Sequence, residues 1–144
     1  MEWTIREARL ADCASITRLN REELGYDFPE EGTREKLRAC LTNPVHKIFV
    51  AESGGEVVGY LHLEDYDVLY FPHMKNVLGI AVAGACRRQG VGRALLAAGE
   101  AWAKADGAVA VRLVSGEGRE GAHAFYQSLG YTGNKLQRNF KKLL

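Results

Sequence analysis

A short polar loop with two glycines separates an apolar run from a helix-like run in the middle of the chain. The loop consists of Arg87, Arg88, Gln89, Gly90, Val91, Gly92 and Arg93. Residues 78–82 before it are strand-like, and the residues from 94 onward are helix-like. Glycine lets the backbone approach a ligand closely, and the first N–H groups of a helix lack internal partners. Such a helix N-terminus binds anions, above all phosphate. The sequence therefore predicts a phosphorylated ligand here.

Two common phosphate-binding motifs do not fit this loop. A dinucleotide fingerprint requires a glycine or alanine three residues after the second glycine, and that position is Leu95. A P-loop requires Gly-Lys followed by Ser or Thr, whereas Gly92 is followed by Arg93 and Ala94. The pattern that remains is Arg-x-x-Gly-x-Gly between a strand and a helix.

Strand-like and helix-like segments alternate along the chain. Apolar and alternating patterns predict strands at residues 3–8, 47–52, 56–66, 76–82 and 108–114, with one or two more after residue 130. Helical spacing predicts helices at residues 12–23, 33–41, 92–106 and 122–129, with Asp12 and Thr33 as caps. Gly54 and Gly55 predict a hairpin turn. We expect one α/β domain over residues 1–144, with a mixed sheet.

Composition argues against several classes of protein. The net charge is +1, so nothing suggests bulk attraction to nucleic acid or a membrane. The longest apolar stretch, residues 77–86, is far shorter than the ~20 residues that span a bilayer. Cys13, Cys40 and Cys86 are widely spaced, which fits no metal motif and favours a reducing compartment. We expect a cytoplasmic protein without metal, nucleic-acid or membrane partners.

A second motif lies one helix and one strand after the glycine loop. Residues 122–131 read Ala-His-Ala-Phe-Tyr-Gln-Ser-Leu-Gly-Tyr. In this order and spacing the two motifs resemble those of the GNAT family of acetyl-CoA-dependent N-acetyltransferases, and the resemblance covers nearly the whole chain. It implies a central, mostly antiparallel sheet with a splayed parallel pair and about four helices. It also implies that acetyl-CoA is the cosubstrate and that residues 87–93 hold its pyrophosphate.

The resemblance implies roles for further residues. The backbone of Ile80, Ala81 and Val82 would pair with the pantetheine arm as an added strand does. Ala81 or Val82 would donate an N–H to the oxyanion that develops at the thioester carbonyl. Tyr126 would protonate the departing thiolate. Arg119 stands where the family usually has asparagine, and it would serve a phosphate or the pantetheine region instead.

The general base is less defined by the sequence. Many relatives carry a carboxylate on the strand before the loop, but residues 76–82 contain neither Asp nor Glu. On the preceding strand, alternation places Tyr60, His62, Glu64 and Tyr66 on one face. Glu64 is our first choice for the base and His62 the second. An ordered water could replace either, and this face could also be plain sheet surface.

Acidic and aromatic residues in two segments suggest the acceptor. Residues 22–31 and 64–73 combine carboxylates with aromatic rings, which suits a cationic amine. We expect direct attack by a small-molecule amine, such as a polyamine or an aminoglycoside, in a ternary complex. A protein lysine or N-terminus is an alternative acceptor, and a non-catalytic acyl-CoA sensor or regulatory module is an alternative function. An exposed C-terminal strand, such as residues 137–143, could pair across a homodimer.

Overall fold

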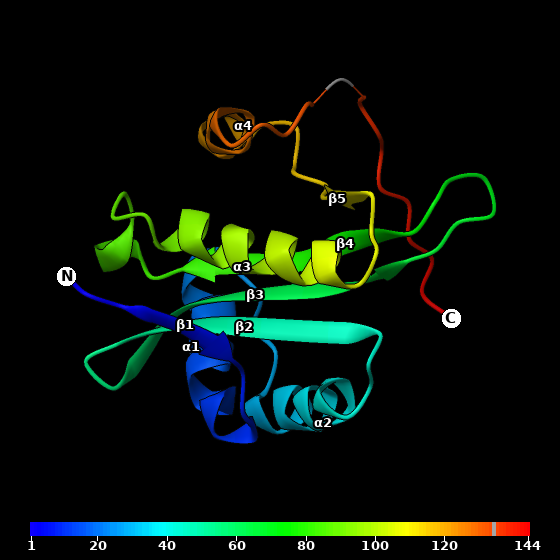
Figure 1. Cartoon of the computed structure of the whole chain (residues 1–144). Helices are drawn as coiled ribbons and strands as arrows, with labels where there is room; N and C mark the ends of the chain where they lie inside the picture. Colours follow the sequence, from blue (N-terminus) through cyan, green and yellow to red (C-terminus); the bar gives the residue numbers. More distant parts are fainter. Residues whose placement is uncertain (134) are drawn as a thin grey trace. The chain divides into compact units, whose positions relative to one another are not determined.

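The computed structural model describes residues 1–133 and 135–144. They divide into two compact units, residues 1–113 and 114–144, and each is described by itself. A single domain over residues 1–144 stays a prediction. The elements of the first unit, drawn in Figure 1, are β1 (Thr4–Glu7), α1 (Cys13–Leu24), α2 (Glu30–Leu41), β2 (His46–Ser53), β3 (Glu56–Tyr66), β4 (Met74–Val82), α3 (Val91–Ala105) and β5 (Ala110–Arg112). The second unit contains α4 (Glu120–Ser128).

The strands of the first unit form one sheet in the order β1-β2-β3-β4-β5. The pairs β1–β2, β2–β3 and β3–β4 are antiparallel, whereas β4 and β5 are parallel. The predicted mixed sheet with a parallel pair is therefore confirmed, together with four α-helices among the described residues. β4 pairs with β5 only from Met74 to Asn76, although it continues to Val82. The last part of β4 thus has an edge that β5 does not cover.

Two local features fix the register of the central strands. Gly54 and Gly55 join β2 to β3 with φ angles of 57° and 77°, which is the left-handed backbone that a tight hairpin requires. In β4 a bulge falls at Leu78, because the adjacent β3 residues Leu63 and His62 pair with Val77 and Gly79 and leave Leu78 without a partner on β3. A bulge leaves one residue unpaired and bends its strand. The bulge lies just beyond the short region where β4 pairs with β5.

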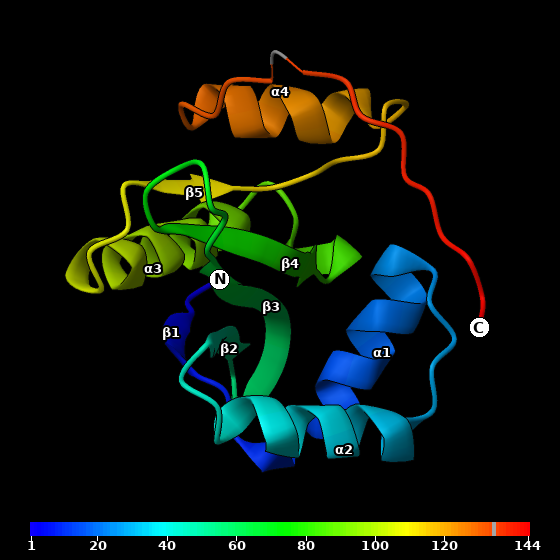
Figure 2. The same cartoon turned by 90° about the vertical axis from the view of Figure 1, so that its right-hand side faces the viewer.

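Helices cover both faces of this sheet (Figure 2). On one face, α1 and α2 bury a core whose members include Ile16, Leu19, Leu37, Ile48, Val50, Tyr60 and Ala81. On the other face, α3 lies close to β3. A Cβ added at Gly99 would lie 2.9 Å from a methyl carbon of Leu61 and 3.2 Å from those of Leu63. The missing side chain at Gly99 therefore lets α3 pack directly against the sheet.

Two predicted boundaries are wrong. Helix α2 begins at Glu30 rather than at Thr33, since Pro29 already has the extended backbone of an N-cap. Thr33 lies inside the helix, where its hydroxyl donates to the Pro29 carbonyl at 3.1 Å. The strand predicted at residues 108–114 shrinks to Ala110–Arg112, and its side chains are exposed or half-buried. It is an edge strand and not a buried one, because it pairs with β4 alone.

The strands predicted after residue 130 are also wrong for the described residues. Residues 131–133 and 135–144 contain no strand. The apolar side chains of Leu136, Phe140 and Leu143 are more than four-fifths exposed, so this apolar pattern buries no face. Residues 137–143 therefore form no strand that could pair across a dimer, and a homodimer stays a prediction. Within the described residues, no helix is both long and apolar enough to cross a bilayer.

Candidate active site

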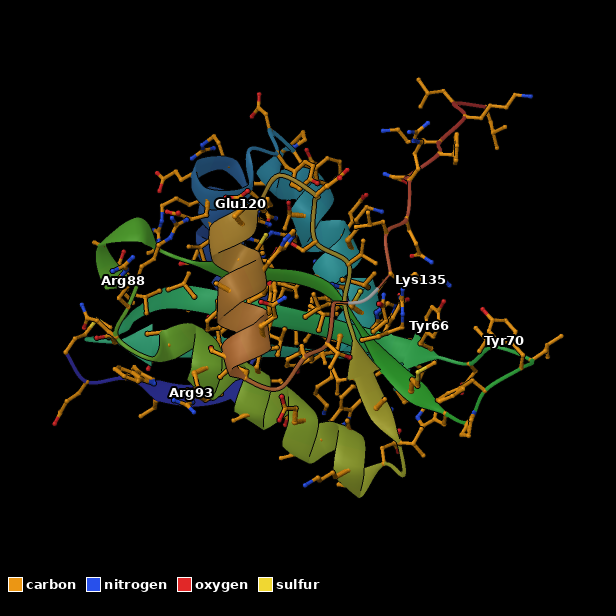
Figure 3. All side chains as sticks on the ribbon, turned by 90° about the horizontal axis from the view of Figure 1, so that it is seen from above. Tyr66, Tyr70, Arg88, Arg93, Glu120 and Lys135 are labelled. Carbon is orange, nitrogen blue, oxygen red and sulfur yellow. The ribbon has the colours of Figure 1, made fainter. Side chains whose placement is uncertain are left out.

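The loop between β4 and α3 presents a helix N-terminus that no side chain caps. Gly90 is the N-cap residue, with a φ of 85°, and Arg88 also has a positive φ of 62°. The first turn of α3 contains no acidic residue. Its leading N–H groups are therefore available to an anion. Figure 3 shows Arg88 and Arg93 at this end of the first unit, and both side chains are exposed.

Glu23, at the end of α1, braces this loop. One of its carboxylate oxygens accepts a hydrogen bond from the Gly84 N–H at 2.9 Å, and the other accepts one from Arg87 Nη2 at 2.7 Å. Arg88 and Arg93 have no such pairing within the described residues, so they are freer than Arg87 to meet a phosphate. The sequence analysis missed Glu23 because a contact across more than 60 residues leaves no local pattern.

The backbone N–H and C=O groups of Ile80 and Val82 point to one side of β4, and those of Ala81 point to the other side. The N–H of Ala83 donates to the Val58 carbonyl of the β3 strand at 2.8 Å. Successive residues of an antiparallel strand direct their N–H and C=O groups to opposite sides. The polar groups of Ala81 therefore point toward β3, while those of Ile80 and Val82 point to the edge that β5 leaves open. Of the two predicted oxyanion donors, only Val82 has this orientation.

Glu64 belongs to a polar network at the start of β4. Its Oε2 accepts a hydrogen bond from Asn76 Nδ2 at 3.0 Å. The Asn76 side-chain oxygen in turn accepts one from Arg112 Nη1 at 2.7 Å, and the Arg112 guanidinium lies 4.3 Å from the ring centre of Tyr66. Oε1 of Glu64 has no hydrogen-bond partner in the described part of the chain. This oxygen is free to accept a proton.

The other two residues of the predicted face make different contacts. The Tyr60 hydroxyl donates to Asn20 of α1, and burial raises the pKa of Tyr60 to about 12. Nε2 of His62 lies 3.0 Å from Nδ1 of His46. Burial, together with His46, lowers the pKa of His62 to about 4. At this pKa His62 has no advantage in basicity over an ordinary carboxylate. Its Nε2 is already engaged by His46, whereas Oε1 of Glu64 has no partner among the described residues, which favours Glu64 over His62.

Tyr126 and Arg119 lie in the second unit, on and before α4. The Tyr126 ring contacts those of Phe125 and Tyr131 at centroid distances of 5.3 Å and 6.1 Å. Burial raises the pKa of Tyr126, although Arg119 opposes this shift. The phenol therefore keeps its proton at neutral pH. Arg119 is the exposed N-cap residue of α4. Their predicted roles toward residues 87–93 stay predictions.

The two segments predicted to bind the acceptor differ in whether their carboxylates form ion pairs. In the second segment, Asp65 and Asp67 form ion pairs with Lys75 and His73. In the first segment, residues 22–31, the exposed side chains include the carboxylates Glu22, Asp27, Glu30 and Glu31 and the rings Tyr26 and Phe28. Apart from Glu23, these carboxylates form no ion pair within the described residues. The first segment is therefore the more anionic surface.

Comparisons with known proteins agree with this fold. Residues 13–131 match the acetyltransferase (GNAT) family. The chain is 32% identical to an N-alpha-acetyltransferase from Sulfurisphaera tokodaii, with 96% of this chain and 86% of that protein covered. It also superposes on the aminoglycoside N-acetyltransferase AAC(6')-Iy, solved with the bisubstrate analogue CoA-S-monomethyl-acetylneamine. That TM-score is 0.88, with 18% identity and full coverage of both chains.

A second similar solved structure carries a different description. A protein from Bacillus halodurans C-125 described as a transcriptional regulator gives a TM-score of 0.90 at 21% identity, with 98% of this chain and 100% of that chain covered. At this identity the likeness concerns the fold alone.

A mixed sheet whose short parallel pair, β4 and β5, is connected through a glycine loop and α3 is the fold that this chain shares with the solved acetyltransferase above. The match over residues 13–131 makes the assignment specific: the chain belongs to the GNAT acetyltransferase family. It is an N-acetyltransferase that uses acetyl-CoA.

Proposed function

We propose that the chain binds acetyl-CoA along the open edge of β4 and transfers the acetyl group directly to the primary amine of a small cationic acceptor. The observation that carries the cofactor assignment is the N-terminus of α3, which has neither a side-chain cap nor an acid in its first turn. The pyrophosphate would accept hydrogen bonds from the N–H groups of residues 91–93. Arg88 and Arg93 would add charge-assisted hydrogen bonds, each contributing about 1.5–3 kcal/mol.

The pantetheine arm would extend along β4 from Val82 toward the bulge at Leu78. Ile80 and Val82 direct their N–H and C=O groups to this open edge, so they can pair with the amides of the arm. Ile80 is nearer than Val82 to the Glu64 network along the strands. We therefore assign the oxyanion donor to the Ile80 N–H in place of the predicted Ala81 or Val82.

Glu64 would act as the general base. An alkyl ammonium has a pKa of about 10.4, so most of an amine acceptor is protonated at neutral pH and cannot attack. Glu64 can accept the proton on Oε1, directly or through a water, while Asn76 fixes the other oxygen. The free amine then attacks the thioester carbonyl, and no covalent intermediate with the protein forms.

Tyr126 would protonate the departing thiolate of CoA. A phenol with a raised pKa stays protonated at neutral pH, so its hydrogen bond is available when the carbon–sulfur bond breaks. The thiol of CoA ionises near pH 8.5, as other thiols do. The expelled thiolate would take the proton of Tyr126, and the resulting phenolate would take up the second proton that the attacking amine loses as the amide forms.

The anionic surface at residues 22–31 supports a cationic acceptor, because carboxylates and aromatic rings attract ammonium groups. The structural likeness to an aminoglycoside N-acetyltransferase agrees with a small polyamine-like molecule. A peptide N-terminus is the second candidate acceptor, since the relative from Sulfurisphaera tokodaii is named an N-alpha-acetyltransferase.

An amine panel tests the proposal. The purified chain is mixed with acetyl-CoA and with polyamines, aminoglycosides or short peptides that carry a free N-terminus, and released CoA thiol is measured. Turnover with the small polycations is the expected result. Turnover with the peptides alone would show that the acceptor is a peptide N-terminus and not a small polycation. Tight binding of acetyl-CoA without turnover across the panel would favour a sensor, and the absence of binding would overturn the cofactor site.

A further inference from the structure

A cluster of metal-binding side chains lies away from the open edge of β4. It consists of Cys40 near the end of α2, His46 at the start of β2 and His62 in β3. The Cys40 sulfur and one ring nitrogen of each histidine all lie within 4.8 Å of one another. All three residues are half-buried, and the cysteine is a free thiol. Three elements thus bring one soft and two borderline ligands to a single point.

We propose that Cys40, His46 and His62 bind one divalent transition-metal ion, with Zn²⁺ as the best chemical match. A thiolate and imidazoles are the ligands that Zn²⁺ prefers, whereas Mg²⁺ and Ca²⁺ prefer oxygen. Three protein ligands leave a fourth tetrahedral position for water. The sequence analysis expected no metal, because the three cysteines are widely spaced, and it did not connect Cys40 with His46 and His62, which follow 6 and 22 residues later. Only the α2–β2 connection and the β2–β3 pairing bring them together.

The distances are close to those of a tetrahedral site. With Zn–N bonds of 2.0–2.1 Å, two histidine nitrogens on one ion are separated by about 3.3 Å. Here Nδ1 of His46 and Nε2 of His62 are 3.0 Å apart. Their rings are tilted by 43° and are not stacked, so both nitrogens can point at a common centre.

The site is also reachable from solvent. A surface hollow between the end of α2 and the end of α3 is lined by residues 41–44, His46, Lys47, Trp102 and Asp106. His46 is part of this lining, so the hollow reaches one of the three ligands directly. Binding would connect α2 to β2 and β3, and it would therefore stabilise the first unit against unfolding.

A second group of possible ligands, Asp65, His73 and Asp106, is less suited to an ion. The Lys75 ammonium already lies between Asp65 and Asp106, and it donates a hydrogen bond to each carboxylate. The same ammonium lies 4.0 Å from the centre of the Trp102 ring. A built-in cation therefore occupies the place that a metal ion would need, and His73 serves as a control for this group.

Cobalt titration provides the first test. The full chain, reduced and stripped of metal with a chelator, is titrated with Co²⁺ and followed by absorption. We expect saturation at one equivalent, a thiolate-to-cobalt charge-transfer band in the near ultraviolet, and strong visible bands typical of four-coordinate cobalt. Equimolar Zn²⁺ should bleach them, and excess Zn²⁺ should raise Tm by about 5 °C. A spectrum without the charge-transfer band would overturn the proposal.

Variants identify the ligands. Cys40→Ser should remove the charge-transfer band, and His46→Gln or His62→Gln should each weaken Co²⁺ binding by about 10-fold or more. The matched controls Cys86→Ser and His73→Gln should bind as the original chain does. Loss in His73→Gln, or an unchanged band in Cys40→Ser, would contradict the assignment. These readouts are independent of acetyl transfer, so a failed amine panel would leave them unaffected.

X-ray absorption on the unaltered chain with one equivalent of Zn²⁺ covers the case in which Cys40→Ser fails to fold. We expect one sulfur at about 2.3 Å and two imidazole nitrogens at about 2.0–2.1 Å. A shell of oxygen and nitrogen alone would refute the proposed ligands.

Discussion

Replacing Gly92 with glutamate should raise the stability of the fold while it abolishes cofactor binding. Gly92 lies in the first turn of α3, a helix whose first turn contains no acid. A glutamate there exchanges a poor helix former for a good one, which contributes about 0.5 kcal/mol. Its charge at a helix N-terminus contributes about 0.3–1 kcal/mol more. The free energy of unfolding should therefore rise by about 1 kcal/mol, and Tm by about 2–4 °C.

The same carboxylate would compete directly with the pyrophosphate. A negative charge about 4 Å from one phosphate charge costs about 4 kcal/mol at an effective dielectric constant of 20. Since each 1.4 kcal/mol is tenfold in affinity, binding of CoA should weaken by about three orders of magnitude. The two effects have opposite signs, so loss of binding could not be attributed to unfolding.

Calorimetric titration with CoA and thermal unfolding measure the two quantities on the same samples. Gly92→Gln is the matched control, since it has nearly the same shape without the charge and should lose much less affinity. The gap between Gln and Glu should narrow at high salt. If Gly92→Glu binds CoA as Gly92→Gln does, the charge argument is wrong. If it binds as the original chain does, the phosphate site lies elsewhere.

Three further predictions concern the loop backbone, the catalytic pair and acid stability. Gly90→Ala should lower the free energy of unfolding by about 1–2 kcal/mol, because Gly90 has a φ of 85°. Gly92→Ala should raise the free energy of unfolding. Equal effects of the two variants in urea unfolding would contradict this difference. Tyr126→Phe should lower kcat about 10–100-fold with little change in KM for acetyl-CoA. Glu64→Gln should flatten the acidic limb of the pH–rate profile. Unchanged kinetics in either variant would mean that the residue has only a structural role. Burial alone would raise the pKa of Asp12, but hydrogen bonds from Arg6 and from the Arg9 N–H hold this pKa below its usual value. Asp12 therefore contributes stability above pH 4 that is lost as the pH falls through its folded pKa. Asp12→Asn should destabilise the chain at pH 7, and urea titrations should show a smaller effect as the pH is lowered below 4.

Local sequence signals were sufficient where one short segment determines the structure. Two adjacent glycines, Gly54 and Gly55, predicted the hairpin, because left-handed backbone is what such a turn needs. The glycine loop predicted the helix start, which the structure has at Val91. By contrast, α2 begins at Glu30 because Pro29 acts as the cap, although the pattern favoured Thr33. Such boundaries depend on competition between neighbouring caps.

Local sequence patterns were insufficient where a contact depends on which strands pair and in which register. Alternation correctly placed His62 and Glu64 on the same side of β3, but it could not show that His62 meets His46 while Glu64 meets Asn76. The choice between Ala81 and its neighbours as oxyanion donor depends on the direction of each N–H, which the register with β3 determines. The brace from Glu23 to the loop likewise exists only after α1 packs near the end of β4.

Strand β4 relates the two ends of the proposed site. Its C-terminal end leads into the phosphate loop, and its N-terminal end carries Asn76, which holds Glu64. From the bulge at Leu78 to Val82 the strand rises about 13 Å at 3.3 Å per residue. The reacting carbonyl would therefore lie at a fixed distance from the pyrophosphate and beside the base. A change at the bulge should shift these two ends relative to each other, and it should reduce kcat while leaving the affinity for CoA intact.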